Sequence, residues 1–421
     1  MKIHRETPKI EIKKGISVIA PKIKDLKTLN ITLEEIDEVV SKHLQIIDSQ
    51  IVESIGPKIV VQKPEESAVR EKFAALRNES LFTENNLKVL IRTEPIAPGN
   101  KQIVIRFYYW EKESVKEQFQ LKKIAWNIGL YVATIVTVAL AGWTYIKSTF
   151  EAYNFSGNMA LDIFLYTICL MGILTVHEFG HYFVSRNKKI DASLPYFIPV
   201  PSFPAFPTLG TFGAVIQQKE QIATRDDLFD IGFSGPIAGF IASVPIFIIG
   251  LSLTYVVDIP ASSGGEVDLT LIPTVFLSDW LLEFSWLTGI LPYFDPTTQV
   301  IVQHPVAFAG WVGFILTGIN LMPASQLDGG HTARSVFGDI PHRIITVVIG
   351  LLLALNQFTR YFGFLILIMG MFQKHPGPTD DVSKVHWSKY VFVVFGYFLA
   401  IICTPWPIYQ IMNLLGIALP A

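Results

Sequence analysis

The stretch LMGILTVHEFGH, residues 170–181, places a metal-binding pattern inside an apolar helix. His177 and His181 are four residues apart, so both imidazoles lie on one helix face and can reach a zinc ion about 2.0–2.1 Å away. Glu178 stands between them, where a carboxylate can hold an attacking water as a general base. Ionisable side chains are costly at membrane depth, and a bound metal would offset that cost.

A catalytic zinc keeps three protein ligands and one open position, so the two histidines need a third partner. Asp328 in NLMPASQLDGG, residues 320–330, is the candidate, because the two glycines that follow it let the backbone turn closely. Taken alone, LDGG is also compatible with an ordinary turn at the end of a membrane span. His331 is left out of the predicted ligand set, since three ligands complete the site without it. Three other histidines are expected to be solvated: His304, His375 and His386.

The composition predicts a membrane protein with a soluble extension. Of the 421 residues, 50% are apolar and only 17% are charged, against about 25% charged in soluble domains. Residues 1–120 hold 38 of the 70 charged side chains, so we expect a soluble domain there and a membrane-embedded domain over residues 121–421. The net charge of -2 argues against nucleic acid as a partner.

Apolar runs long enough for helices predict a multi-pass α-helical membrane protein with six or seven spans. The runs lie at residues 124–146, 159–184, 231–257, 305–321, 344–359, 361–373 and from 390 onward. The pair 344–359 and 361–373 fits either a tight hairpin or one long tilted helix. Loops on the cytosolic side of a membrane are rich in Lys and Arg, and residues 226–333 have neither. We therefore expect residues 258–304 on the outer side of the cell membrane and the N-terminal domain in the cytosol.

The soluble domain has the alternating patterns of a small α+β fold. Strands are expected at residues 16–20, 58–62, 87–92 and 102–110. Thr32 and Glu35 form a capping box for one helix, and Pro64 opens a second helix through about Arg77. No cluster of His, Cys or acidic residues resembles a catalytic site, which favours a regulatory or substrate-binding role.

A segment rich in proline, residues 195–207, breaks any helix after the HEFGH motif. The residues that follow, 208–217, are predicted to form a short re-entrant strand pair that dips back into the membrane. An exposed strand edge there could hold an unwound peptide segment by β-augmentation. The alternative is a plain proline-rich surface loop.

Together, the two motifs resemble those of the site-2 protease family of intramembrane zinc metalloproteases. HEFGH matches the family's HExxH, and NLMPASQLDGG matches its downstream Asn-Pro-Asp-Gly motif. Residues 194–199, 210–214 and 234–239 also resemble corresponding family segments. The soluble N-terminal extension is similar to that of the archaeal and chloroplast subgroup, although the Gly-Asn-Leu-Arg motif of the plastid members is absent.

The resemblance implies one Zn²⁺ per chain, with His177, His181 and Asp328 as ligands, Glu178 as catalytic base and Asn320 assisting substrate or transition state. It implies a zinc metalloendopeptidase that cleaves a peptide bond in or near a transmembrane segment of a membrane-protein substrate within the lipid bilayer. The alternative is a metal-binding membrane transporter or a non-proteolytic membrane scaffold. Glu178 separates these hypotheses, since neither alternative needs a general base beside the metal.

Overall fold

The computed structural model divides into two compact units, Met1–Ser114 and Val115–Ala421. Each unit is described by itself below. The residues that the structure describes are 31–52, 56–97, 100–109, 117–153, 157–203, 208–218, 221–258, 275–295, 298–355, 359–372 and 375–405.

The first unit is built on a four-stranded antiparallel sheet with strand order β1-β2-β4-β3. The strands are β1 (Ile46–Val52), β2 (Gly56–Val61), β3 (Leu87–Ala97) and β4 (Asn100–Tyr109). Helix α1 (Leu33–Ser41) packs against β1, while α2 (Val69–Arg77) and the short α3 (Ser80–Glu84) pack against β3. The Thr32–Glu35 capping box is present at the start of α1.

Two parts of this unit differ from the sequence prediction. Strand β1 was missed because a register shift between Ile46 and Asp48 interrupts the alternation of apolar and polar residues along this edge strand. Helix α2 begins at Val69 rather than at Pro64, with Ala68 as its N-cap. The strand predicted at residues 16–20 lies outside the described residues.

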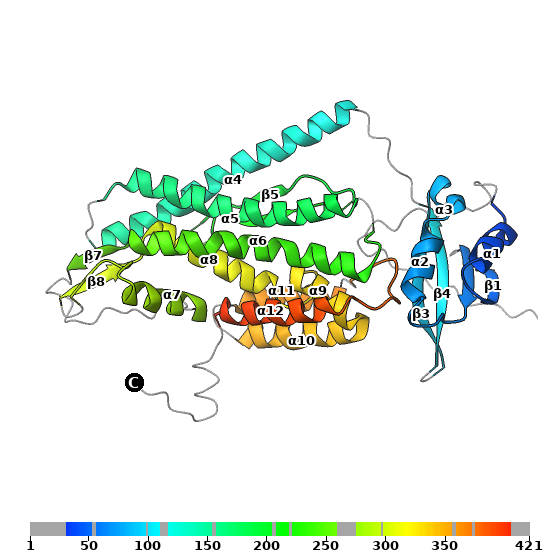
Figure 1. The fold of residues 1–421 in the computed structure, drawn as a ribbon. Helices are drawn as coiled ribbons and strands as arrows, with labels where there is room; N and C mark the ends of the chain where they lie inside the picture. The colour runs from blue at the N-terminus through cyan, green and yellow to red at the C-terminus, as the bar shows by residue number, and fades with distance from the viewer. Residues whose placement is uncertain are drawn as a thin grey trace, which may run out of the picture. The chain divides into compact units, whose positions relative to one another are not determined.

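The second unit is mostly helical, as its apolar runs predict (Figure 1). Among the described residues, three helices are long and apolar enough to cross a membrane: α4 (Glu117–Ala152), α5 (Met159–Asn187) and α6 (Arg225–Ser252). Shorter apolar helices are α8 (Pro305–Asn320), α11 (Arg360–Phe372) and α12 (Ser388–Ile402). The remaining helices in the described part are α7 (Phe276–Leu287), α9 (Asp328–Phe337) and α10 (Asp339–Leu355).

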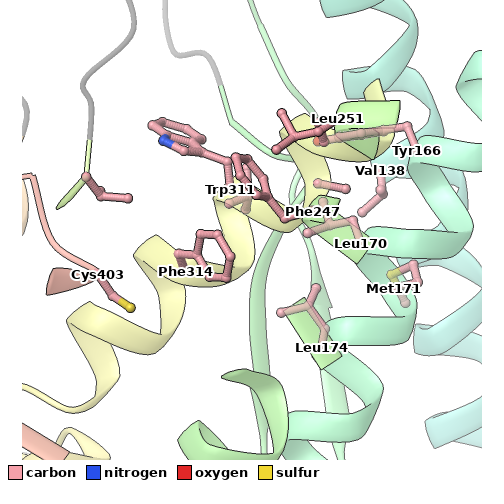
Figure 2. Close-up of a cluster of buried hydrophobic side chains, with 14 of the residues drawn as sticks. Val138, Tyr166, Leu170, Met171, Leu174, Phe247, Leu251, Trp311, Phe314 and Cys403 are labelled. Atoms are coloured by element: carbon pink, nitrogen blue, oxygen red, sulfur yellow. The ribbon is translucent and has the colours of Figure 1, made fainter. Parts of the chain in front are cut away.

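Helices α5, α6 and α8 pack on one another around the main apolar core (Figure 2). Tyr166, Leu170 and Leu174 come from α5 and meet Phe247 of α6 and Phe314 of α8. Small residues allow the close approach. A Cβ at position 250 would lie 2.1 Å from the Ala307 nitrogen, and one at position 310 would lie 2.7 Å from the Phe247 backbone. The three helices therefore form a tightly interlocked block.

Helices α10 and α11 form an antiparallel hairpin, which is the first of the two arrangements that the sequence left open. Gly350 packs against Leu367, and Gly363 packs against the backbone of Ala354. Residues later in α10 therefore contact residues earlier in α11, so the two helices are antiparallel and residues 344–373 do not form one continuous helix.

The described part of the second unit also contains two small antiparallel sheets. One pairs β5 (Tyr196–Pro199) with β6 (Thr211–Val215), and the other pairs β7 (Tyr255–Asp258) with β8 (Gln299–Val302). The prediction of a strand pair within residues 208–217 was therefore partly wrong. Only β6 lies there, and its partner comes from the proline-flanked segment before it.

Candidate metal centre

Three side chains from two helices converge in the second unit. His177 and His181 lie one turn apart on α5 and are buried, as is Glu178 between them. Asp328 is the first residue of α9 and follows the loop of residues 321–327 that leaves α8. Within the described part of the chain, His177, His181 and Asp328 form the one group of three His, Cys, Asp or Glu side chains placed to share a metal ion.

The donor atoms of this group form a nearly equilateral triangle. The two histidine Nε2 atoms are 3.3 Å apart, and Asp328 Oδ2 lies 3.3 Å from His177 Nε2 and 3.2 Å from His181 Nε2. A tetrahedral ion with ligand bonds of about 2.0–2.1 Å has ligand-to-ligand edges of roughly 3.3–3.4 Å. The spacing and the His–His–carboxylate chemistry therefore both fit a zinc ion with a fourth position left open.

The tautomer of His181 is set by a backbone carbonyl of α6. His181 Nδ1 lies 2.7 Å from the Ile231 oxygen, and because a carbonyl can only accept, Nδ1 carries the proton and donates. The lone pair of Nε2 then points toward the other two donors. Metal-bound histidines in proteins are commonly oriented by such a bond from the second ring nitrogen.

Glycines on α6 make room for both imidazole rings. A Cβ at Gly235 would lie 2.1 Å from His181 Nε2, and one at Gly239 would lie 3.1 Å from His177 Nδ1. Position 180 on α5 is equally tight, since a Cβ there would lie 2.9 Å from the Ser234 oxygen. The two histidine rings thus pack against residues 234–239 of α6.

Strand β6 lies beside Glu178. The backbone N–H of Ala214 faces the Glu178 carboxylate, and Phe212 and Val215 of the same strand are exposed. The strand pair is tied to α4 at both ends. Asn127 Nδ2 donates to the Leu194 and Pro195 oxygens at 3.0 and 2.9 Å, and Thr137 Oγ1 donates to the Gly210 oxygen at 2.6 Å.

Neither Asn320 nor His331 belongs to the donor triangle of His177, His181 and Asp328. Asn320 is the last residue of α8 and is partly buried, so its role toward a substrate stays a prediction. His331 Nδ1 lies 2.6 Å from His375 Nε2. Because His375 Nδ1 accepts the Gly377 N–H, its Nε2 carries the proton and donates to His331. Burial lowers the pKa of His375, which keeps this ring neutral.

The expectation of solvated histidines was wrong for His304 and His375, which are both buried, whereas His386 is exposed. His304 Nε2 lies 3.4 Å from Asp162 Oδ1, and its Nδ1 accepts the Val306 N–H. Both buried histidines precede a proline and accept the N–H two residues ahead. This His-Pro-X pattern was a sequence signal for a structured turn.

The family match and the similar proteins agree in pointing to a peptidase. Residues 165–368 match peptidase family M50. The chain is 31% identical over 226 residues to "Probable zinc metalloprotease EGY1, chloroplastic" of Arabidopsis thaliana, covering 52% of this chain and 39% of that protein. It is 30% identical over 244 residues to "Probable zinc metalloprotease EGY2, chloroplastic" of the same plant, covering 56% and 40%.

The aligned region thus spans about two fifths of the length of these relatives. No solved structure matches the chain. The matched segment contains the three residues of the donor triangle, His177, His181 and Asp328. It also contains Gly235 and Gly239 of α6, which face the two histidine rings. Residues 165–368 therefore match peptidase family M50, and this match together with the zinc metalloprotease relatives supports placing the domain in the site-2 protease family.

Proposed function

We propose that this chain is a zinc-dependent endopeptidase that hydrolyses a peptide bond in or near a transmembrane segment of a membrane protein. The observation that carries the proposal is the donor triangle of about tetrahedral edge length, with a buried carboxylate next to it on the same helix. The match of residues 165–368 to peptidase family M50 and the names of the relatives support the same chemistry.

In this proposal His177, His181 and Asp328 hold one zinc ion. When bound, zinc supplies a Lewis acid that polarises the scissile carbonyl and acidifies water. The Glu178 carboxylate accepts a proton from the attacking water and returns it to the nitrogen of the leaving amine. Asn320 is assigned to binding the substrate near the scissile bond.

Strand β6 is proposed to receive the substrate backbone. A helical segment has its own amides hydrogen-bonded, so it must unwind before water can attack a peptide carbonyl. An extended segment can then pair with a strand edge, and β6 lies beside Glu178 with Phe212 and Val215 exposed. Pairing would align the scissile carbonyl with the base.

The proposal places the second unit in the cell membrane with six or seven spans and the N-terminal domain in the cytosol. The three long apolar helices and the three shorter ones support a multi-pass arrangement. Residues 1–120 are assigned to regulation or substrate choice, and residues 121–421 to the membrane-embedded protease. The bilayer and a membrane-protein substrate are the partners that follow.

Glu178→Gln tests the mechanism. The amide keeps the size of the side chain and leaves the three donors in place, while it removes the proton acceptor. We expect the purified variant in detergent to retain its zinc by metal analysis and to cut no single-span candidate substrate that the wild-type protein cuts. Wild-type cleavage should stop when a zinc chelator is added.

Cleavage by Glu178→Gln at a near wild-type rate would show that this carboxylate is not the base. A wild-type protein that binds zinc but cuts none of the candidates, while moving the ion across vesicle membranes, would favour the transporter alternative.

A further inference from the structure

The loop of residues 321–327 determines where Asp328 stands. Its internal hydrogen bonds are few: the Ala324 N–H donates to the Met322 oxygen at 2.7 Å and the Leu327 N–H to the Ala324 oxygen at 3.2 Å. Ser325 has a φ of 50°, in the left-handed region that residues with a Cβ seldom adopt. This backbone conformation needs support from outside the loop.

Helix α10 supplies that support to both backbone groups of Ser325. The Ser325 N–H donates to Thr346 Oγ1 at 2.9 Å, and His342 Nε2 donates to the Ser325 oxygen at 3.1 Å. The Thr346 hydroxyl in turn donates to the His342 carbonyl at 2.9 Å. His342 and Thr346 are four residues apart, so they share one face of α10, and both are buried.

The first turn of α9 follows the loop rigidly. A Cβ at Gly329 would lie 2.1 Å from the Leu321 oxygen, and one at Gly330 would lie 2.4 Å from the Ser325 oxygen. Because these backbones touch, a shift of Ser325 moves the residues on either side of Gly329 as well. Asp328 is the residue immediately before Gly329, so its carboxylate moves too.

We propose that His342 and Thr346 are positioning residues for the third zinc ligand. They hold Ser325 in its left-handed conformation, and the packed turn then sets Asp328 Oδ2 at 3.2–3.3 Å from the two histidine nitrogens. This inference rests on the proposed function, since it assumes that the triangle binds zinc.

The outward face of α10 carries Ile344, Val347 and Leu351, which are exposed apolar side chains suited to lipid.

Thr346→Val is the primary test, because valine keeps the shape and removes the hydroxyl. Zinc affinity is measured on the purified full-length protein by chelator competition, alongside thermal unfolding. Loss of a group that orients a metal ligand commonly weakens metal binding by about 10–100-fold, which is the change expected here. Thr346→Ser, which keeps the hydroxyl, should stay within about threefold of wild type.

Thr359→Val is the matched control. Thr359 is also buried, and its hydroxyl donates to the Leu353 oxygen at 2.9 Å at the opposite end of α10. This variant should lose a comparable hydrogen bond and some thermal stability, yet keep wild-type zinc affinity.

A rescue experiment separates positioning from general stability. Glycine adopts a positive φ without steric cost, so Ser325→Gly should restore zinc affinity in the Thr346→Val background to within about threefold of wild type. The double variant also serves as the folded test protein if Thr346→Val alone does not accumulate.

Wild-type zinc affinity in Thr346→Val would overturn the inference, as would an equal loss of affinity in Thr346→Val and Thr359→Val. Failure of the wild-type protein itself to bind zinc would instead refute the proposed function.

Discussion

Replacing Gly235 with alanine should disable the candidate metal centre although none of its three ligand residues is changed. The added Cβ would lie 2.1 Å from His181 Nε2, whereas ordinary van der Waals contact begins at 3.4 Å. The imidazole or the helix must therefore move by about 1.3 Å, at a packing cost of roughly 1–3 kcal/mol. Metal–ligand distances in well-formed sites vary by only about 0.2 Å, so His181 would leave the coordination sphere.

A graded series of alanine variants makes the expectation quantitative. We expect Gly235→Ala to weaken zinc binding by about 100-fold or more and to lower proteolysis in parallel. Gly239→Ala, with a Cβ at 3.1 Å from His177 Nδ1, needs a shift of only a few tenths of an ångström and should give an intermediate loss. Gly172→Ala, on α5 with no atom within 4 Å of the new Cβ, is the control and should bind zinc normally.

The assay is chelator competition on purified protein in detergent, with thermal unfolding to show that each variant is folded. The reasoning would be refuted by wild-type zinc affinity in Gly235→Ala, because the ring of His181 would then not occupy the space that α6 leaves. A loss of affinity in Gly172→Ala equal to that in Gly235→Ala would refute it as well, since insertion of any methyl group would then have the same effect.

Two further predictions concern the third ligand and the N-terminal domain. Asp328→Ala should lower zinc occupancy and activity together, because two histidines alone form an incomplete site; full zinc content by metal analysis would point to another ligand, with His331 the first suspect. A protein beginning near Glu117 should still bind zinc and cut an unstructured model substrate, while its preference among membrane substrates changes; a folded, zinc-loaded truncation that cuts nothing would show that residues 1–116 contribute to the catalytic cavity.

Local sequence patterns were enough to predict much of the framework. The apolar run ahead of HEFGH predicted α5, and the four-residue spacing predicted that His177 and His181 would share a face. The Thr32 capping box and three of the four strands in the described sheet of the first unit also followed from local patterns. These features depend on neighbours in the sequence, so the sequence contains the information needed to find them.

Features that depend on contacts between distant segments could not be read in this way. The approach of Asp328 to His181, 147 residues earlier, had only the paired motifs to indicate it. The Ile231 carbonyl that orients His181 has no side-chain signature, because every residue carries such an oxygen. Likewise, a glycine in an apolar helix does not reveal which ring it faces, so the roles of Gly235 and Gly239 required the packed structure.

The packing of two imidazole rings against the glycines of α6 fixes the position of α5 along α6. Sliding α5 along α6 by a single residue, about 1.5 Å, would drive the His181 ring into a neighbour of Gly235. Close contacts at Gly250 and Gly310 fix the position of α8 along α6 in the same way. His177 and His181 are thus held in place by the packing of α5 on α6. Under the proposed function, we expect the movement that admits a peptide in parts outside this contact, such as the strand pair held to α4.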